Sequence, residues 1–171
     1  MNQAILIKRK LSDYLSNDIN ERGRGACLWF DAYYNTGSVT QESQINSDLL
    51  VCDLHGIYQL DAILELGDQP ASVQICDQVF HQDNIDRQAA DEIWRHDRSP
   101  SLSVGDIVLI GDIEASRQPF YQTNSPEGFQ AWICCQFGWR ELTPAQRDLF
   151  RFKIRLSWIQ LQKHRKASQA A

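Results

Sequence analysis

Two Cys/His pairs have a spacing that could bind a metal ion. Cys52 and His55 are separated by two residues, and Cys76 and His81 by four. A structural zinc site usually takes four such ligands in tetrahedral geometry. Here each pair falls in a segment expected to form a strand or a helix, with the thiol among apolar residues. We therefore predict no metal site and no cofactor. The cysteines are then buried, reduced thiols that act as small apolar residues: Cys27, Cys52, Cys76, Cys134 and Cys135.

Residue types suited to nucleophilic catalysis are also present. Cys135, His96 and Asp97 could supply a nucleophile, a base and an orienting group. The chain has no Gly-x-Ser-x-Gly elbow, no phosphate-binding loop and no dinucleotide-binding glycine pattern. We predict a protein that is not an enzyme, and a small hydrolase or nuclease stays as the last alternative.

The distribution of charge is a more specific signal than any catalytic pattern. Residues 25–86 contain ten Asp or Glu and no Lys or Arg, although the whole chain has a net charge of only −5. Such an excess either keeps a protein soluble or forms a surface for a basic partner, and self-repulsion within it destabilises the folded state. We predict a partner-binding acidic surface that includes Asp48, Asp53, Asp61, Glu65, Asp68, Asp77 and Asp83.

The C-terminal segment has the opposite charge. Residues 142–171 contain seven Lys or Arg and one Asp, and they include Trp158 and two phenylalanines. A basic helix of this kind can bind phosphates, or its cations can complement the acidic body and the helix dipole. Direct nucleic-acid binding is therefore an alternative, through Arg147, Arg151, Arg155, Lys163, Arg165 and Lys166.

The same segment predicts a long helix. Thr143 is a suitable N-cap residue and Pro144 suits the first helical position, so we expect a basic helix over residues 143–166 with a frayed tail. Its apolar residues form two stripes on nearly opposite sides. One stripe is Leu149, Phe152, Leu156 and Ile159, and the other is Phe150, Ile154, Trp158 and Leu161. Either the helix is wedged within its own fold, or one stripe packs a partner chain, which would give a homodimer.

The remaining periodicities predict the other elements. Helices are expected over residues 3–16, 71–84 and 86–96, the last with Asp86 as N-cap. Strands are expected over residues 26–34, 101–112 and 130–137, with Asp106 facing outward and the last two strands paired. Residues 48–66 are expected to form one long bent strand or two strands, with Gly56 at the bend or a bulge. The predicted fold is a single α+β domain spanning 1–171, with an antiparallel or mixed sheet of four to six strands.

The start of the chain has basic residues after a short apolar run, which is the reverse of a signal peptide. No apolar run approaches the roughly 20 residues that a membrane span needs. We predict a cytoplasmic protein that does not bind membranes.

About 65 residues, 75–142, contain three motifs of a known domain. Val79, Phe80 and residues 84–87 form the first, Ser101–Val104 with residues 106–108 the second, and Trp132, Phe137, Gly138, Glu141 and Leu142 the third. With these motifs the segment resembles the YodL-like domain. The chain departs from that pattern at Gly105 and at Cys134–Cys135, where the family often has Val-Asp. The Asp that could have been catalytic is therefore absent at position 135.

Residues 30–39, "FDAYYNTGSV", are similar to a Tyr-Asn-x-Gly-Ser motif of the ArdA antirestriction proteins, which are small acidic DNA mimics. YodL-like domains occur in proteins of plasmids, phages and conjugative elements. The two resemblances together imply a mobile-element accessory protein of the antirestriction or anti-CRISPR type. Such a protein would bind and inhibit a nucleic-acid-handling complex of host defence through its acidic surface.

Overall fold

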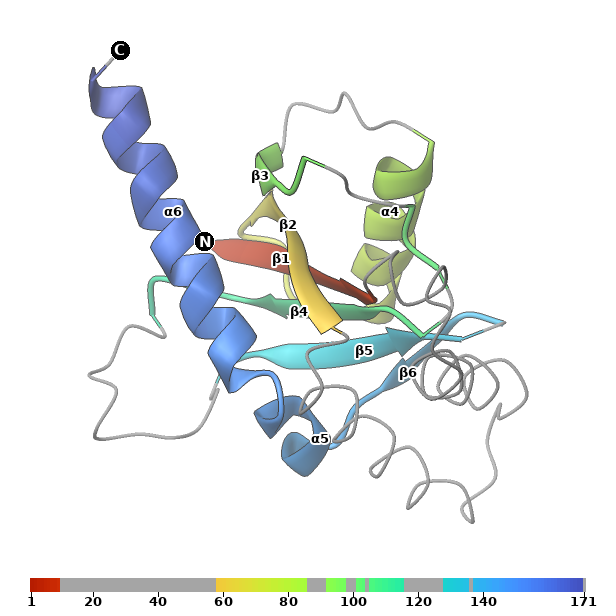
Figure 1. Ribbon diagram of the computed structural model, residues 1–171. Coiled ribbons are helices and arrows are strands. Elements are labelled where there is room, and N and C mark those ends of the chain that lie inside the picture. Colours follow the sequence, from red (N-terminus) through yellow and green to blue (C-terminus); the bar gives the residue numbers. More distant parts are fainter. Residues whose placement is uncertain are drawn as a thin grey trace, which may run out of the picture.

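The computed structural model describes residues 1–9, 58–85, 92–97, 101–103, 105–115, 128–135 and 137–170. These residues contain a six-stranded sheet in the order β3-β2-β1-β4-β5-β6, with every neighbouring pair antiparallel (Figure 1). The strands are β1 (Asn2–Arg9), β2 (Tyr58–Gly67), β3 (Glu92–Arg95), β4 (Ile107–Gly111), β5 (Gln130–Cys134) and β6 (Trp139–Glu141). The predicted α+β fold with a sheet of four to six strands is confirmed.

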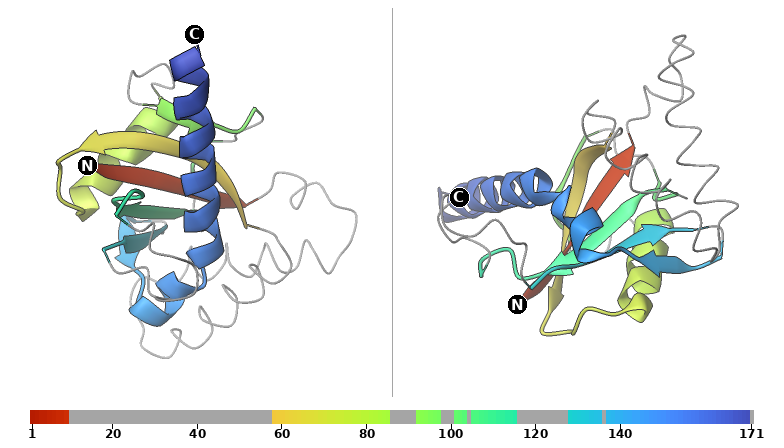
Figure 2. Two further views of the ribbon diagram at one scale, coloured as in Figure 1. Left: turned by 90° about the vertical axis from the view of Figure 1, so that its left-hand side faces the viewer. Right: turned by 90° about the horizontal axis from the view of Figure 1, so that it is seen from below.

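Helices cover both faces of this sheet (Figures 1 and 2). Successive residues of a strand point to opposite faces. On the central strand β1, Ile5 and Ile7 therefore join the core under α5 (Pro144–Asp148) and α6 (Arg151–Ala170). Ala4 and Leu6 face the other core, which α4 (Val73–Asn84) covers. Residues 4–7 of β1 are apolar on both faces because both faces are buried there.

The N-terminal segment is a strand, so the helix predicted over residues 3–16 is wrong for residues 3–9. β1 pairs with β2 on one side and β4 on the other, and residues Gln3 to Ile7 have partners on both strands. The helical spacing of Ile7 with later apolar residues favoured a helix, but pairing on both edges overrides that local pattern. Residues 10–16 lie outside the described residues, as do the predicted strand at 26–34 and residues 48–57.

The helix predicted over residues 86–96 is also wrong for the part of it that the structure describes. Residues Glu92 to Arg95 form β3, which pairs with β2 at the edge of the sheet. Its Ile93 and Trp94 pack against the core on the α6 side. Pairing with β2 satisfies backbone groups that a helix would have satisfied internally. Asp86, the predicted N-cap, lies outside the described residues.

Several predicted elements are confirmed. α4 begins after Ser72, whose side chain accepts a hydrogen bond from the Ile75 N–H. β4 and β5 form the predicted pair. Thr143 caps α5 in a capping box with Gln146, and Pro144 is the first helical residue. The C-terminal helix is not continuous, however, because α5 ends at Asp148 and α6 begins at Arg151 and extends to Ala170.

Most apolar residues of this helical region pack on its own sheet. Phe150, Ile154 and Leu161 are buried, and Trp158 packs against them. From the other stripe, Leu149 and Leu156 reach the same core, whereas Phe152 is 59% exposed. A partner chain on the exposed side stays a prediction. In the part of the chain that the structure describes, no helix combines the length and the apolar character needed to cross a membrane.

Candidate functional site

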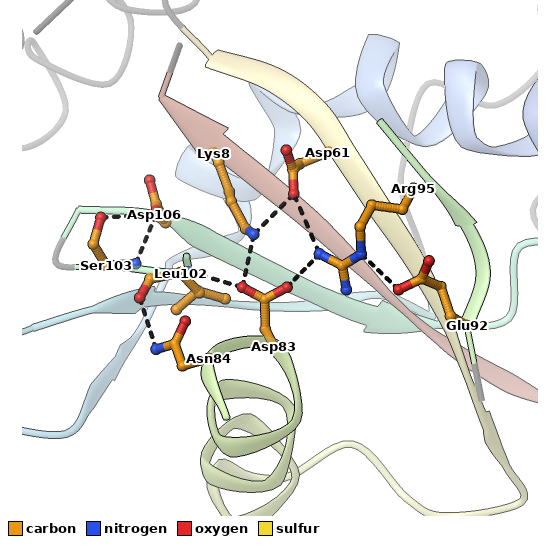
Figure 3. A network of polar contacts seen from close by, with 9 residues as sticks. All are labelled: Lys8, Asp61, Asp83, Asn84, Glu92, Arg95, Leu102, Ser103 and Asp106. Atoms are coloured by element: carbon orange, nitrogen blue, oxygen red, sulfur yellow. Dashed lines mark hydrogen bonds and ion pairs between the residues drawn. The ribbon is translucent and has the colours of Figure 1, made fainter. Parts of the chain in front are cut away.

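Five charged side chains meet on the α4 face of the sheet and form what we call the buried charge network: Lys8, Asp61, Asp83, Glu92 and Arg95 (Figure 3). The Lys8 ammonium lies 2.8 Å from Asp61 Oδ2 and 2.7 Å from Asp83 Oδ2. Arg95 Nη1 lies 2.6 Å from Asp83 Oδ1, and its Nε lies 2.5 Å from Glu92 Oε2. The network joins β1, β2, β3 and α4.

An irregularity in strand pairing places Asp61 in this network. Along β1, Leu6 is opposite Ala62 but Ile7 is opposite Leu60, so Asp61 is the extra residue of a β-bulge. A bulge changes the direction of the side chain at that position. Lys8 follows the ordinary alternation of β1 and faces α4, so the two charges meet.

Asp83 connects the network to the segment before β4. Besides Lys8 and Arg95, its carboxylate accepts a hydrogen bond from the Leu102 N–H at 2.8 Å, and the neighbouring Asn84 donates to the Leu102 carbonyl at 2.9 Å. Burial alone would raise the pKa of Asp83, but Lys8 and Arg95 outweigh it and hold that pKa below its ordinary value. Asp83 therefore stays ionised and ties the end of α4 to the segment before β4.

The predicted place on a partner-binding surface is thus wrong for two of the seven acids. Asp61 and Asp83 have no exposed side-chain surface, and each is ion-paired to Lys8. Asp106, predicted to face outward, is also buried, and it accepts hydrogen bonds from the N–H and Oγ of Ser103. Sequence reasoning missed the network because Lys8 precedes Arg9 and Lys10, a pattern typical of a solvated segment.

The network has the properties of a structural element. Lys8, Asp61 and Asp83 have no side-chain atom that a substrate could reach. Within the described residues, no group of three or more His, Cys, Asp or Glu side chains could hold a metal ion. The arrangement instead satisfies charges that would be costly to bury alone.

The residues considered for metal binding or nucleophilic catalysis are separated from one another or unreactive wherever the structure describes them. Cys76 is buried and His81 is exposed, five residues apart on α4, so they are not neighbours on one face. Burial raises the pKa of the Cys135 thiol, which disfavours the nucleophilic thiolate. His96 and Asp97 are exposed after β3. Cys52 and His55 lie outside the described residues.

Three predicted acids remain at the surface. Glu65 is half-buried and accepts a hydrogen bond from Gln3 at 3.3 Å, Asp68 is exposed, and Asp77 accepts from Trp139 Nε1 at 3.0 Å. The Met1 ammonium is ion-paired with Asp112 at 3.1 Å, and Asp68 and Glu65 add to the raised pKa of that amine. Asp48 and Asp53 lie outside the described residues.

The six predicted basic residues all lie in α5 or α6. Arg147 donates to the Phe129 carbonyl at 2.6 Å, Arg151 pairs with Asp148 at 2.7 Å, and Arg165 pairs with Glu114. Arg155, Lys163 and Lys166 also lie on α6 and are exposed, as are Arg151 and Arg165. Lys153 was not predicted, and it is buried with its ammonium on the Tyr58 carbonyl at 2.7 Å. α6 contains no Asp or Glu.

No family model matches the chain, and neither a curated protein nor a solved structure was found to match it. The resemblance to the YodL-like domain therefore stays a prediction. The function has to be argued from the surfaces described above.

Proposed function

We propose that this protein is a non-enzymatic binding protein that contacts nucleic acid through the outward side of α6. The observation that carries the proposal is the composition of this side. It combines the exposed cations Arg155, Lys163 and Lys166 with the exposed ring of Phe152, on a helix without a single acid. Lys and Arg neutralise phosphates, and aromatic rings stack on unpaired bases.

Helix geometry places these residues together. At 100° per residue, positions 152, 155, 159, 163 and 166 fall on one side of α6, opposite the buried Phe150, Ile154 and Leu161. Residues 163–170 are all exposed and continue for about 12 Å beyond Leu161 at a rise of 1.5 Å per residue. Figure 1 shows this end of α6 projecting past the sheet. A projecting helix can enter a groove that the acidic body could not approach.

The charge of the rest of the chain sets how such binding behaves. Outside α6 the chain is strongly acidic and repels a duplex, so attraction depends on the few cations of the helix. Binding by few phosphate contacts is weak at physiological salt and strengthens as salt is lowered. We expect measurable binding mainly at low ionic strength.

The test is fluorescence anisotropy of a labelled duplex and of a labelled single strand at about 50 mM salt. The variant Lys163→Gln/Lys166→Gln removes two exposed cations that follow Leu161, the last buried residue of α6. We expect it to bind about tenfold more weakly than the wild type. The control Arg140→Gln removes a cation from β6 and should bind like the wild type. Equal binding by the double variant and the wild type would contradict the proposal.

A second candidate function retains the acidic partner-binding surface that was predicted from residues 25–86. Residues 58–85 contain no Lys or Arg, and two of their acids, Asp68 and Asp77, are exposed. Together with the resemblances, this supports a cytoplasmic accessory protein of a mobile element that binds a basic site on a host nucleic-acid-handling complex. A pull-down from lysate at low and moderate salt tests it. A salt-sensitive protein partner that survives nuclease supports this candidate, and a nuclease-sensitive one supports binding by α6.

A further inference from the structure

Two aromatic side chains meet at the surface where α4 approaches β6. The ring centroids of Phe80 and Trp139 are 6.3 Å apart and their planes are inclined by 80°. Phe80 is 37% exposed and Trp139 is half-buried. Phe137 is 76% exposed two residues before Trp139, across Gly138 at a φ of 81°. Aromatic surface left in water at the rim of a core is typical of an interaction site.

A carboxylate lies at the edge of this ring pair. Asp77 precedes Phe80 by one turn of α4, and its Oδ1 accepts a hydrogen bond from Trp139 Nε1 at 3.0 Å. Among the described residues, its other oxygen, Oδ2, has no hydrogen-bond partner. We call Asp77, Phe80 and Trp139 the aromatic corner.

Among the described residues, neither α4 nor the outward side of β6 places a Lys or Arg beside the aromatic corner. α4 contains no Lys or Arg, and neither does any residue between Tyr58 and Ile85. Arg140 follows Trp139 on β6, but successive side chains of a strand point to opposite faces, so Arg140 faces away from α4. An exposed carboxylate at the edge of two rings, with no cation from its own helix, complements a cation from outside.

We propose that the aromatic corner binds an arginine side chain from a basic segment of a protein partner. A guanidinium can stack on an indole or phenyl face while its N–H groups donate to a carboxylate, whereas an ammonium lacks the planar surface for stacking. The Trp139 N–H fixes the carboxylate in place before binding, which lowers the entropic cost of binding. A phosphate-bearing ligand is disfavoured by Asp77.

This inference deepens the second candidate above, and it does not depend on nucleic-acid binding by α6. The two failures are distinguishable because α6 is tested with nucleic acid and the aromatic corner with peptides.

The experiment is a titration followed by the indole N–H signals of 15N-labelled protein, with the Trp139 signal assigned through Trp139→Phe. The probe is a short glycine-spaced peptide with four arginines. We expect the Trp139 signal to move and to saturate at peptide concentrations on the order of 1 mM. No movement of this signal up to about 10 mM would overturn the inference.

Asp77→Asn removes the charge but keeps an oxygen that can accept the Trp139 hydrogen bond. We expect it to bind about tenfold more weakly, with an unchanged set of the other indole signals as evidence of folding. Asp68→Asn is the matched control with the same loss of charge, and it should bind like the wild type. Equal weakening by both variants would indicate unspecific attraction and overturn the site.

Phe80→Leu tests the rings separately, because it removes one wall and keeps an apolar residue of similar size. The variant should bind the peptide more weakly, while the Trp139 indole signal keeps a chemical shift typical of the folded protein. A tetralysine peptide of the same spacing should bind more weakly than the arginine peptide. Equal binding of the two peptides would contradict the assignment of arginine.

Discussion

Lys8 and Asp83 are 75 residues apart in the chain, yet their charged groups lie 2.7 Å apart and neither side chain is exposed. Asp61 and Arg95 complete their surroundings. Removing charges from water costs several kcal/mol per ion, and a close partner with further hydrogen bonds offsets that cost. The contact therefore fixes how α4 lies on β1.

Asp83→Asn should be strongly destabilising. The variant leaves the Lys8 and Arg95 cations with one carboxylate fewer in a buried place, which costs about 3–5 kcal/mol. Urea unfolding followed by circular dichroism gives the free energy of unfolding. Asp77→Asn on the exposed side of α4 is the control and should change it by less than about 0.5 kcal/mol. A loss below about 1 kcal/mol for Asp83→Asn would show that the network contributes little.

Acid should destabilise the protein through the same carboxylate. The folded-state pKa of Asp83 lies below its ordinary value of 3.8, because Lys8 and Arg95 outweigh the effect of burial. Its contribution to stability is therefore complete above about pH 5 and is lost as the pH falls through the folded-state pKa. The free energy of unfolding measured between about pH 6 and pH 2 should drop less in Asp83→Asn than in the wild type. Parallel curves would exclude this role of Asp83.

The capping box of α5 should be measurable by a single substitution. Thr143→Ala removes the side-chain oxygen that accepts the Gln146 N–H at 3.3 Å, and we expect a loss of about 1 kcal/mol in thermal or urea unfolding. Thr143→Ser keeps the oxygen and should retain most of the stability. If both variants lose the same amount, packing of the threonine methyl group is the cause.

Cys76 should react slowly with iodoacetamide in the native protein. Burial is the main cause that raises the pKa of its thiol to about 12, and the side chain is fully buried. Mass spectrometry of peptides after labelling at about pH 8 should show Cys76 modified only on unfolding in urea. Rapid native labelling would show that α4 separates from the sheet on the time scale of the reaction.

The elements with local signals were predictable from the sequence. Thr143 and Pro144 predict the start of α5, and the apolar run from Ile107 to Ile110 predicts β4. In each case the decisive residues are neighbours in the chain.

The elements that were missed depend on distant residues. Lys8 suits a buried strand only because Asp61 and Asp83 neutralise it, and no local pattern predicts a strand with a buried charge. The sequence between Glu92 and Arg95 becomes a strand because β2 has an edge to pair. The same long-range pairing turned two acids of the predicted binding surface into buried ones, and no count of charges along the chain could show this.

We propose above that exposed cations of α6 bind nucleic acid. The most direct measurement is the dependence of duplex affinity on salt, for the wild type and for Lys163→Gln/Lys166→Gln, by anisotropy between about 20 and 150 mM salt. Each lost phosphate contact should lower the slope of log affinity against log salt by roughly 0.9. We expect a slope lower by about 2 in the variant, as the proposal assigns a phosphate contact to each of the two lysines. Identical slopes, or no binding even at about 20 mM salt, would contradict it.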